Sequence, residues 1–384
     1  GLRNILNTTG NQGRFNTSVG INLSLALTTG SFNTSIGKDA LLNLTTGGSN
    51  TAVGVGTLEN ISTASNNSAF GLYALRANTT GANNSAFGIN SLLSNTNGSA
   101  NTAVGINALR LNVSGGGNIA IGSQAMNSSR LGSNNVVVGS SAGFDIGALQ
   151  TATNIVAGIT YQIETIGTTD FTLIGASSNT IGIIFTATGA GTGTGTVYPN
   201  TNTNNNTIIG NNTGRGIVTG QNNTILGSSI TGLPSTLTGN VIISDGIGNQ
   251  RIRIDAQGNT GIGTITPTSS LHTQGSIASS VLVVTTTITL NNTHNTLIIQ
   301  NGATAITIRL PDALTCIGRE YVMSRYAGST GTITVVGGAG NQIQALNGTV
   351  GATTSIALHG ATGQGLNVRF TAVNIAGVGV WVRL

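Results

Sequence analysis

Residues 101–109 read "NTAVGINAL", and the first five letters of this stretch return along the chain at a fixed interval of 17 residues. The first block of repeated asparagines contains Asn16, Asn33, Asn50, Asn67, Asn84, Asn101, Asn118 and Asn135. A second block with the same spacing contains Asn206, Asn223 and Asn240. A repeat with a fixed period indicates a fold built from identical units, so it has to be interpreted before single residues are.

The repeated unit has the consensus N-[TS]-[AS]-[VIF]-G-x-x-A-L, followed by a polar bridge that often reads "TTG". Its "TAV" segment predicts a short strand, which the glycine ends at a corner, because glycine reaches backbone angles that strain other residues. Asparagine is typical of turns, and asparagines stacked at one level per repeat can form a ladder. The unit is too short for a helical hairpin. We therefore predict an all-β fold in which each unit is one coil of a parallel β-solenoid, with about 4.8 Å between coils.

The strand of each unit is apolar on both faces. Neighbouring residues of a strand point to opposite sides, yet both central residues of "TAVG", "NTIIG" and "NTILG" are apolar. A strand of this kind has to be covered on both sides. One side fills the interior of the coil, and the other predicts a partner. We expect this partner to be another copy of the chain, in a homotrimer around one axis.

The repeats and their interruptions predict five segments. These are β-solenoid repeats over 1–145, an inserted small β-domain over 146–200, a second solenoid block over 201–265, a neck over 266–284 and a C-terminal antiparallel β tip domain over 285–384. Within the insertion we predict strands at Tyr161–Thr165, Phe171–Ile174 and Ile183–Thr188. After Asn240 the period lengthens to 19 residues and reaches "NTGIG" at Asn259.

The composition excludes several classes of protein. Only 6% of the 384 residues are charged, while 38% are hydrophobic, which argues against disorder. The net charge of +5 comes from scattered arginines, so no basic stripe predicts binding to nucleic acid. No apolar run approaches the roughly 20 residues of a membrane-spanning helix, and we expect no membrane insertion. Cys316 is the only cysteine, and we expect a buried, inert thiol there.

No group of residues predicts catalysis, a metal or a cofactor. His272, His294 and His359 are far apart in the sequence, and none has the spacing of a metal ligand with a second His, Cys or acid. The stretch "GAGTGTGTV" has no following helix to hold a phosphate. Two carboxylate pairs, Asp245 with Asp255 and Asp312 with Glu320, could in principle cleave a glycosidic bond. We expect all four residues to lie in turns and salt bridges instead. We therefore predict that the chain is not an enzyme.

The repeats resemble those of bacteriophage tail fibres, and they are similar to the shorter repeats in the head domains of trimeric autotransporter adhesins. The stretch "GNTGIGTITPTSSLHTQGSIASS" at 258–280 resembles the segment before the terminal domains of tail fibres, and "GATAITIRLPDALTCIGREYVM" is similar to fibre-tip domains. The resemblance implies left-handed β-rolls of three chains that bind a host surface. The chain departs from the adhesins in its longer repeat, and no membrane-anchor barrel follows in this sequence. It departs from chaperone-tailed fibres because it stops at "GVWVRL", so that we expect a helical chaperone either never to have been present or to have been removed.

Together these observations predict a structural and adhesive fibre of the virion or of an extracellular or cell surface. The resemblance implies, as partners, other tail or fibre proteins and a host surface polysaccharide or protein receptor. Aromatic and arginine side chains gather in the tip, where they are useful against sugars and proteins. The candidates for receptor contact are Arg319, Tyr321, Arg325, Tyr326, His359 and Trp381.

Three alternatives stay open. One is a tail spike that degrades polysaccharide, and a second is a bacterial surface adhesin or an extracellular filament subunit. The third is an ice-binding solenoid, suggested by the threonine bridges at 28–29, 45–46 and 79–80, although the threonine column changes to Asn97, Val113 and Arg130.

Overall fold

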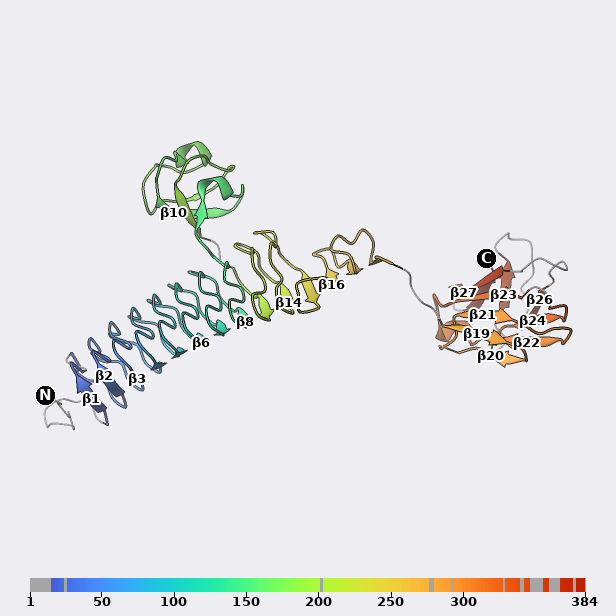
Figure 1. The fold of residues 1–384 in the computed structure, drawn as a ribbon, viewed down its shortest axis with the longest axis horizontal. Coiled ribbons are helices and arrows are strands. Elements are labelled where there is room, and N and C mark those ends of the chain that lie inside the picture. The colour runs from blue at the N-terminus through green and yellow to red at the C-terminus, as the bar shows by residue number, and fades with distance from the viewer. Residues whose placement is uncertain are drawn as a thin grey trace. The chain divides into compact units, whose positions relative to one another are not determined.

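The computed structural model describes residues 15–23, 26–200, 203–275, 280–291, 293–326, 329–338, 342–345, 355–358, 367–375 and 378–383. Over these ranges the chain forms strands and turns with three short 3-10 helices. It divides into two compact units, Gly1–Gly275 and Ser276–Leu384. The first unit holds the solenoid and the inserted domain, and the second is the C-terminal domain (Figure 1).

The first unit confirms the predicted parallel β-solenoid. Each repeat contributes one strand, and within each of the two blocks a strand residue pairs with the residue 17 positions later, as Ser68 pairs with Ser85. The parallel strands are β1 (Thr17–Ile21), β2 (Thr34–Lys38), β3 (Thr51–Val53), β4 (Ser68–Phe70), β5 (Ser85–Phe87), β6 (Thr102–Val104), β7 (Ile119–Ile121), β8 (Val136–Val138), β13 (Thr207–Ile209), β14 (Thr224–Leu226) and β15 (Val241–Ser244). Alanine and leucine columns inside the coils form its core, including the fully buried Ala103 and Leu109.

The repeated asparagines form the predicted ladder. The side-chain amide of Asn101 donates to Oδ1 of Asn84 at 3.1 Å and to the carbonyl of Gly115 at 2.9 Å. Its own Oδ1 accepts from the backbone N–H and the side-chain amide of Asn118, at 3.1 and 3.0 Å. These side chains are buried, so each ladder asparagine satisfies polar groups in two neighbouring coils and fixes their register.

A second, shorter asparagine column lies inside the solenoid. Asn95 donates to Oδ1 of Asn78 at 2.9 Å, and Asn112 donates to Oδ1 of Asn95 at 2.7 Å. The carbonyl of Gly98 accepts from this column and from the main ladder, since Asn84 and Asn95 each reach it at 2.9 Å. In earlier coils the same place is taken by Leu44 and Ile61, both fully buried, so this column is apolar in the first coils of the first block and polar in its later coils.

Two glycine columns have different physical causes. Gly88, at the end of its strand, has φ +133°, and an added Cβ would lie 2.6 Å from the carbonyl oxygen of Gly105 in the next coil. Gly98, in the other column, has no positive φ, and an added Cβ would meet the side chain of Asn95 and the carbonyl of Gly115. The predicted glycine corner therefore applies to the first column, whereas the second is glycine because the coils approach closely.

The insertion is an antiparallel sheet with its own core of Tyr161, Phe171, Phe185 and Val197. Because of the insertion, paired residues of the two flanking solenoid strands, β8 and β13, are 71 positions apart in the sequence instead of 17. Val137 still pairs with Ile208. The elements are β9 (Gln150–Thr151), η1 (Ala152–Asn154), β10 (Thr160–Thr165), η2 (Phe171–Ile174), β11 (Ile184–Thr186) and β12 (Thr196–Pro199). The ladder continues across the insertion, because Asn206 donates to Oδ1 of Asn135 at 3.1 Å.

The structure corrects two details of the predicted insertion. Phe171–Ile174 is a 3-10 helix instead of a strand, because Phe171 and Ile174 are three residues apart and are both buried, while Leu173 between them is 80% exposed. Asp170 caps this helix by accepting from the backbone N–H of Thr172 at 3.0 Å. The insertion also begins later than residue 146, since Ile146 still packs in the solenoid core.

After β15 the sheet continues with two antiparallel pairings and ends with a parallel one. The predicted longer coil of 19 residues is instead a hairpin, in which β16 (Gln250–Ile254) runs antiparallel to β15 and to β17 (Thr260–Ile262). The last strand, β18 (Leu271–Thr273), lies in the predicted neck and pairs with β17. Arg253 in the hairpin donates from Nε to Oδ1 of Asn240 at 3.0 Å, and so ends the asparagine ladder.

The C-terminal domain contains two sheets. The first has the strand order β19 (Val281–Val284), β21 (Thr296–Ile299), β23 (Glu320–Arg325), β27 (Asn367–Ile375), β28 (Val378–Arg383) and β25 (Gln342–Ala345), and the second has the order β20 (Ile288–Thr289), β22 (Ile306–Arg309), β24 (Ile333–Val336) and β26 (Ser355–Leu358). A 3-10 helix, η3 (Ala313–Thr315), precedes β23. The predicted antiparallel pairing is present between β23, β27 and β28 and between β24 and β26. The strands before them pair in parallel, because the chain alternates between the two sheets from β19 to β24.

Candidate functional site

The outward face of the solenoid strands is apolar and exposed. We call the residue after the buried central residue of each strand the first outer column, and the residue after the following corner glycine the second outer column. Side chains of the first column that are 36–46% exposed are Val19, Ile36, Phe70, Phe87, Val104, Ile121, Ile209 and Ile243, and those of the second column that are 40–53% exposed are Ile21, Val55, Leu72, Ile89 and Ile106. The apolar residues of the first column were the basis for predicting that this face needs a partner. The second column was not identified from the sequence.

The two outer columns form a regular surface. Strand pairing places Phe70 directly beside Phe87, and their rings stack at 5.0 Å with an angle of 6° between them. Lys38 is the one charged residue in the second column among the coils from Asn16 to Asn101. It lies beside Asp39, with Nζ 3.5 Å from its carboxylate. The face therefore presents hydrocarbon and aromatic groups in rows, with almost no charge.

The carboxylates considered for glycoside cleavage are held in local turns and ion pairs. Asp245 accepts from Arg251 at 2.6 Å and from the Asn249 side chain at 2.9 Å. Asp255 accepts from the Asn259 side chain at 3.0 Å, in a second turn of the same D-x-x-G-N sequence. This placement confirms the expectation that these acids are turn and salt-bridge residues.

The second pair is engaged in the same manner. Asp312 accepts from the backbone N–H of Leu314 at 3.0 Å and begins η3. Glu320 lies 3.4 Å from the Arg369 guanidinium and accepts from the Thr371 hydroxyl at 3.3 Å. Both carboxylates have structural partners that explain their positions.

Hydrogen bonds shift the titration of the hairpin aspartates. The Asn249 amide, followed by the Arg251 guanidinium, lowers the pKa of Asp245 to about 2. The Asn259 amide lowers the pKa of Asp255 from its ordinary value. A general acid for glycoside cleavage needs a raised pKa, so these shifts have the opposite direction.

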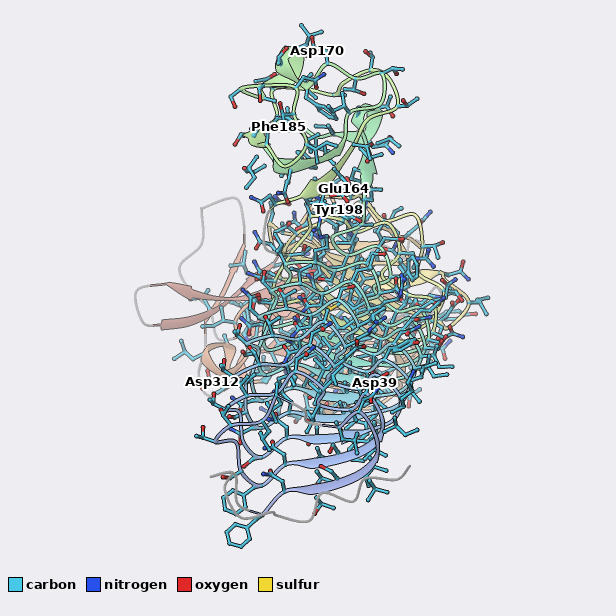
Figure 2. All side chains as sticks on the ribbon, turned by 90° about the vertical axis from the view of Figure 1, so that its left-hand side faces the viewer. Asp39, Glu164, Asp170, Phe185, Tyr198 and Asp312 are labelled. Atoms are coloured by element: carbon cyan, nitrogen blue, oxygen red, sulfur yellow. The ribbon has the colours of Figure 1, made fainter. Side chains whose placement is uncertain are left out.

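Arg130 of the solenoid contacts an aromatic and a charged side chain of the insertion. The guanidinium carbon of Arg130 lies 4.1 Å from the centroid of the Tyr198 ring, and Nη1 lies 3.6 Å from the carboxylate of Glu164. Figure 2 shows Glu164 and Tyr198 at one end of the inserted domain and Asp170 at the other. A small cleft between Arg130, Gln162 and Tyr198 accompanies this contact. Arg130 stands where earlier coils have a bridge threonine. The coil that contacts the insertion therefore differs from the repeat consensus at the contacting residue.

An ion pair links the two coils on either side of the insertion. Arg215 donates to Asp145 at 2.7 Å, and the backbone N–H of Gly216 donates to the same carboxylate at 2.9 Å. The guanidinium of Arg215 also lies 4.9 Å from the centroid of the Phe144 ring. These contacts join the coil before the insertion to the coil after it.

The predicted receptor-contact residues of the C-terminal domain occupy different environments. Tyr321 and Trp381 are fully buried, with ring centroids 5.5 Å apart, so they belong to the core and offer no surface to a receptor. Their polar atoms donate to the carbonyls of Asn291 and Pro311 at 2.9 and 3.0 Å. The prediction of receptor contact was therefore wrong for Tyr321 and Trp381, because both aromatic side chains fill the core of the domain.

The other candidates differ in accessibility. Tyr326 is 57% exposed, and Arg325 next to it is half-buried and donates to the carbonyl of Gly331. Arg319 is half-buried near Tyr321, while His359 lies outside the described residues. Tyr326 and Arg325 therefore stay adjacent candidates at the surface of this domain.

The remaining titratable groups considered from the sequence have local partners. His272, in β18, accepts from the backbone N–H of Thr268 at 3.3 Å, and His294 accepts from that of Asn291 at 3.0 Å, so each is held by a residue close to it in the sequence. Cys316 is buried, and burial raises the pKa of its thiol, as expected for an inert cysteine. In the described ranges, no group of three His, Cys, Asp or Glu residues could hold a metal ion.

Comparisons with known proteins do not assign a family. No family model, curated protein or solved structure matches the chain. Within the part of the chain that the structure describes, no helix is long and apolar enough to cross a membrane. The conclusions on function therefore depend on the geometry of the chain itself.

Proposed function

We propose that the chain is a structural and adhesive fibre subunit, homotrimeric and similar to a phage tail fibre, without enzymatic activity. In this proposal the solenoid is the shaft, and the C-terminal domain attaches the fibre to a host cell surface. The virion, or the surface of a cell, is the proposed location.

The observation that carries the proposal is the asparagine ladder. It runs without interruption from Asn16 to Asn240, and it keeps its register where the insertion separates Asn135 from Asn206. Each step is about 4.8 Å, so the stacked coils build length from buried, repeating hydrogen bonds. A shaft needs this property, whereas an enzyme needs a group of activated side chains.

The exposed part of the C-terminal domain supports an adhesive role. Tyr326 offers a flat apolar ring with a polar edge, and the Arg325 guanidinium lies on the adjoining residue. These are the residue types that bind sugars and proteins at surfaces. Leu173 in the insertion is also well exposed and provides a matched position on the other folded domain.

The test is binding of the fluorescently labelled full-length chain to a panel of bacterial strains, measured by flow cytometry. We expect Tyr326→Ala and Arg325→Ala to reduce binding by about tenfold, the effect of losing a central contact residue. Leu173→Ala should leave it unchanged. Undiminished binding of both tip variants would show that Tyr326 and Arg325 do not contact the receptor. Release of reducing sugar ends from surface polysaccharide would favour a polysaccharide-degrading tail spike instead.

A further inference from the structure

The two outer columns form a larger apolar surface than a monomer needs. Their thirteen exposed side chains leave on the order of 1,000 Å² of apolar area open, well above the few hundred Å² of an ordinary exposed patch. The same area exceeds the roughly 800 Å² that each partner contributes to a typical stable interface. The face is therefore large enough for a protein–protein contact.

The spacing of the face identifies the chemistry of its partner. Its apolar groups recur once per coil, about 4.8 Å apart, because each coil adds one parallel strand. A surface that matches this row group by group has to carry side chains at the same interval, which another parallel solenoid does. A second copy of this chain has that interval and the same residue at every level.

The width of the face changes along the solenoid. The second outer column is apolar at Leu72, Ile89 and Ile106 and becomes polar at Ser123 and Ser140. In these later coils the first strand residue becomes apolar instead, at Ile119 and Val136, in place of the earlier threonines and serines. The apolar strip therefore moves across the face by two or more residues, or about 7 Å at roughly 3.3 Å per residue.

The shift distinguishes the two possible directions of a partner copy. In an antiparallel arrangement that overlaps all the coils from Asn16 to Asn240, Leu72 and Ile89 of one copy would lie level with Ser140 and Ser123 of the other. In a parallel arrangement at the same level, apolar positions meet apolar positions in every coil. We propose that the outer columns pack against the same face of other copies of the chain, parallel and in register. This inference deepens the proposed fibre by naming the surface that assembles it.

The first experiment measures the mass of the full-length chain in solution by light scattering. We expect the wild type at three times the 38.4 kDa of one chain. Phe87→Asp with Ile106→Asp should reduce the mass to one chain, because the aspartates would be buried at the interface without partners. Thr80→Asp, on an exposed bridge, is the matched control and should leave the mass unchanged.

The milder pair Ile89→Thr with Ile106→Thr keeps β-branched residues on the face and tests the same contact with less risk to folding. We expect a measurable rise in the dissociation constant of the assembly and an unchanged β-sheet signal in circular dichroism. A monomeric wild type would overturn the inference. Thermal hysteresis of that monomer would indicate that the apolar face binds ice. An unchanged mass for both variants would also overturn it.

The second experiment measures direction. In a Cys316→Ser background, Val104→Cys should be linked between chains by a short bismaleimide, because parallel copies in register place residue 104 at one level. Thr80→Cys should not be linked. Failure of linking at residue 104, in an assembly of confirmed mass, would overturn the parallel register. These results are independent of cell binding, so a failure here and a failure of the proposed attachment can be told apart.

Discussion

The solenoid fills its core with alanine, leucine and stacked asparagine, whereas the C-terminal domain fills its core with Trp381, Tyr321 and Phe370. The side chain of a buried ladder asparagine such as Asn101 makes four hydrogen bonds, while the side chain of the buried Asn301 of the C-terminal domain donates one, to Thr304. The difference shows two ways of specifying a fold. The solenoid repeats one small set of polar contacts, and the C-terminal domain relies on large side chains that each occur once.

The largest expected effect comes from the glycine that separates two coils. We expect Gly88→Ala to destabilise the solenoid by at least about 4 kcal/mol, because the added Cβ would lie 2.6 Å from a backbone carbonyl that the stacking holds in place. The unfolding transition of the first unit, followed by calorimetry, measures this loss.

The matched control is Gly302→Ala in the C-terminal domain. Gly302 also has a positive φ, +55°, but nothing lies within 4 Å of an added Cβ, so the cost should be about 1 kcal/mol. Equal losses for the two variants would mean that backbone angle, and not the contact between coils, fixes the glycine column.

The ladder provides the second test. Asn101→Ala removes the acceptor of the Asn118 N–H and a donor to the Gly115 carbonyl, and we expect a loss of about 3 kcal/mol in the free energy of unfolding. Asn301→Ala removes a single donated hydrogen bond, and we expect about 1 kcal/mol. Denaturant unfolding of both variants gives the comparison, and a smaller loss for Asn101→Ala would contradict a ladder-based solenoid.

The smallest effect concerns acid. Hydrogen bonds lower the pKa of Asp245 from 3.8 to about 2, so its contribution to stability is present above about pH 4 and is lost as the pH falls towards 2. We expect a lower unfolding temperature of the first unit in this range. Asp245→Asn should reduce the pH dependence, since Asn249 and Arg251 then lose a carboxylate partner at every pH. An identical pH profile for the variant would show that Asp245 does not contribute.

Most of the solenoid could be predicted, because its determinants recur at one spacing. Asn101 and its equivalents, the "TAV" strand and the corner glycine each reveal their role by repetition. The second asparagine column was missed because Asn78, Asn95 and Asn112 follow Leu44 and Ile61 at the same place, so it has no periodic residue type. The hairpin of Gln250–Ile254 was missed because Asn259 imitates a longer repeat.

The candidate sites could be predicted less well, because they depend on which side of a strand faces solvent. Tyr321 and Tyr326 lie five residues apart on or beside one strand, yet one is fully buried and the other 57% exposed. Sequence alone does not separate them without the sheet pairing of β23. The second outer column follows the corner glycine, and its exposure becomes clear only from the direction of the chain in the turn beyond that corner.

The side domain has a consequence for how such a chain can change. Thr151 near its start pairs with Thr196 near its end, so its two ends lie side by side, and the asparagine ladder closes across the gap without a change of register. A folded module at this point of the chain therefore leaves the stacking of the coils unchanged. The number of coils and the side domain can accordingly vary separately, each by whole units.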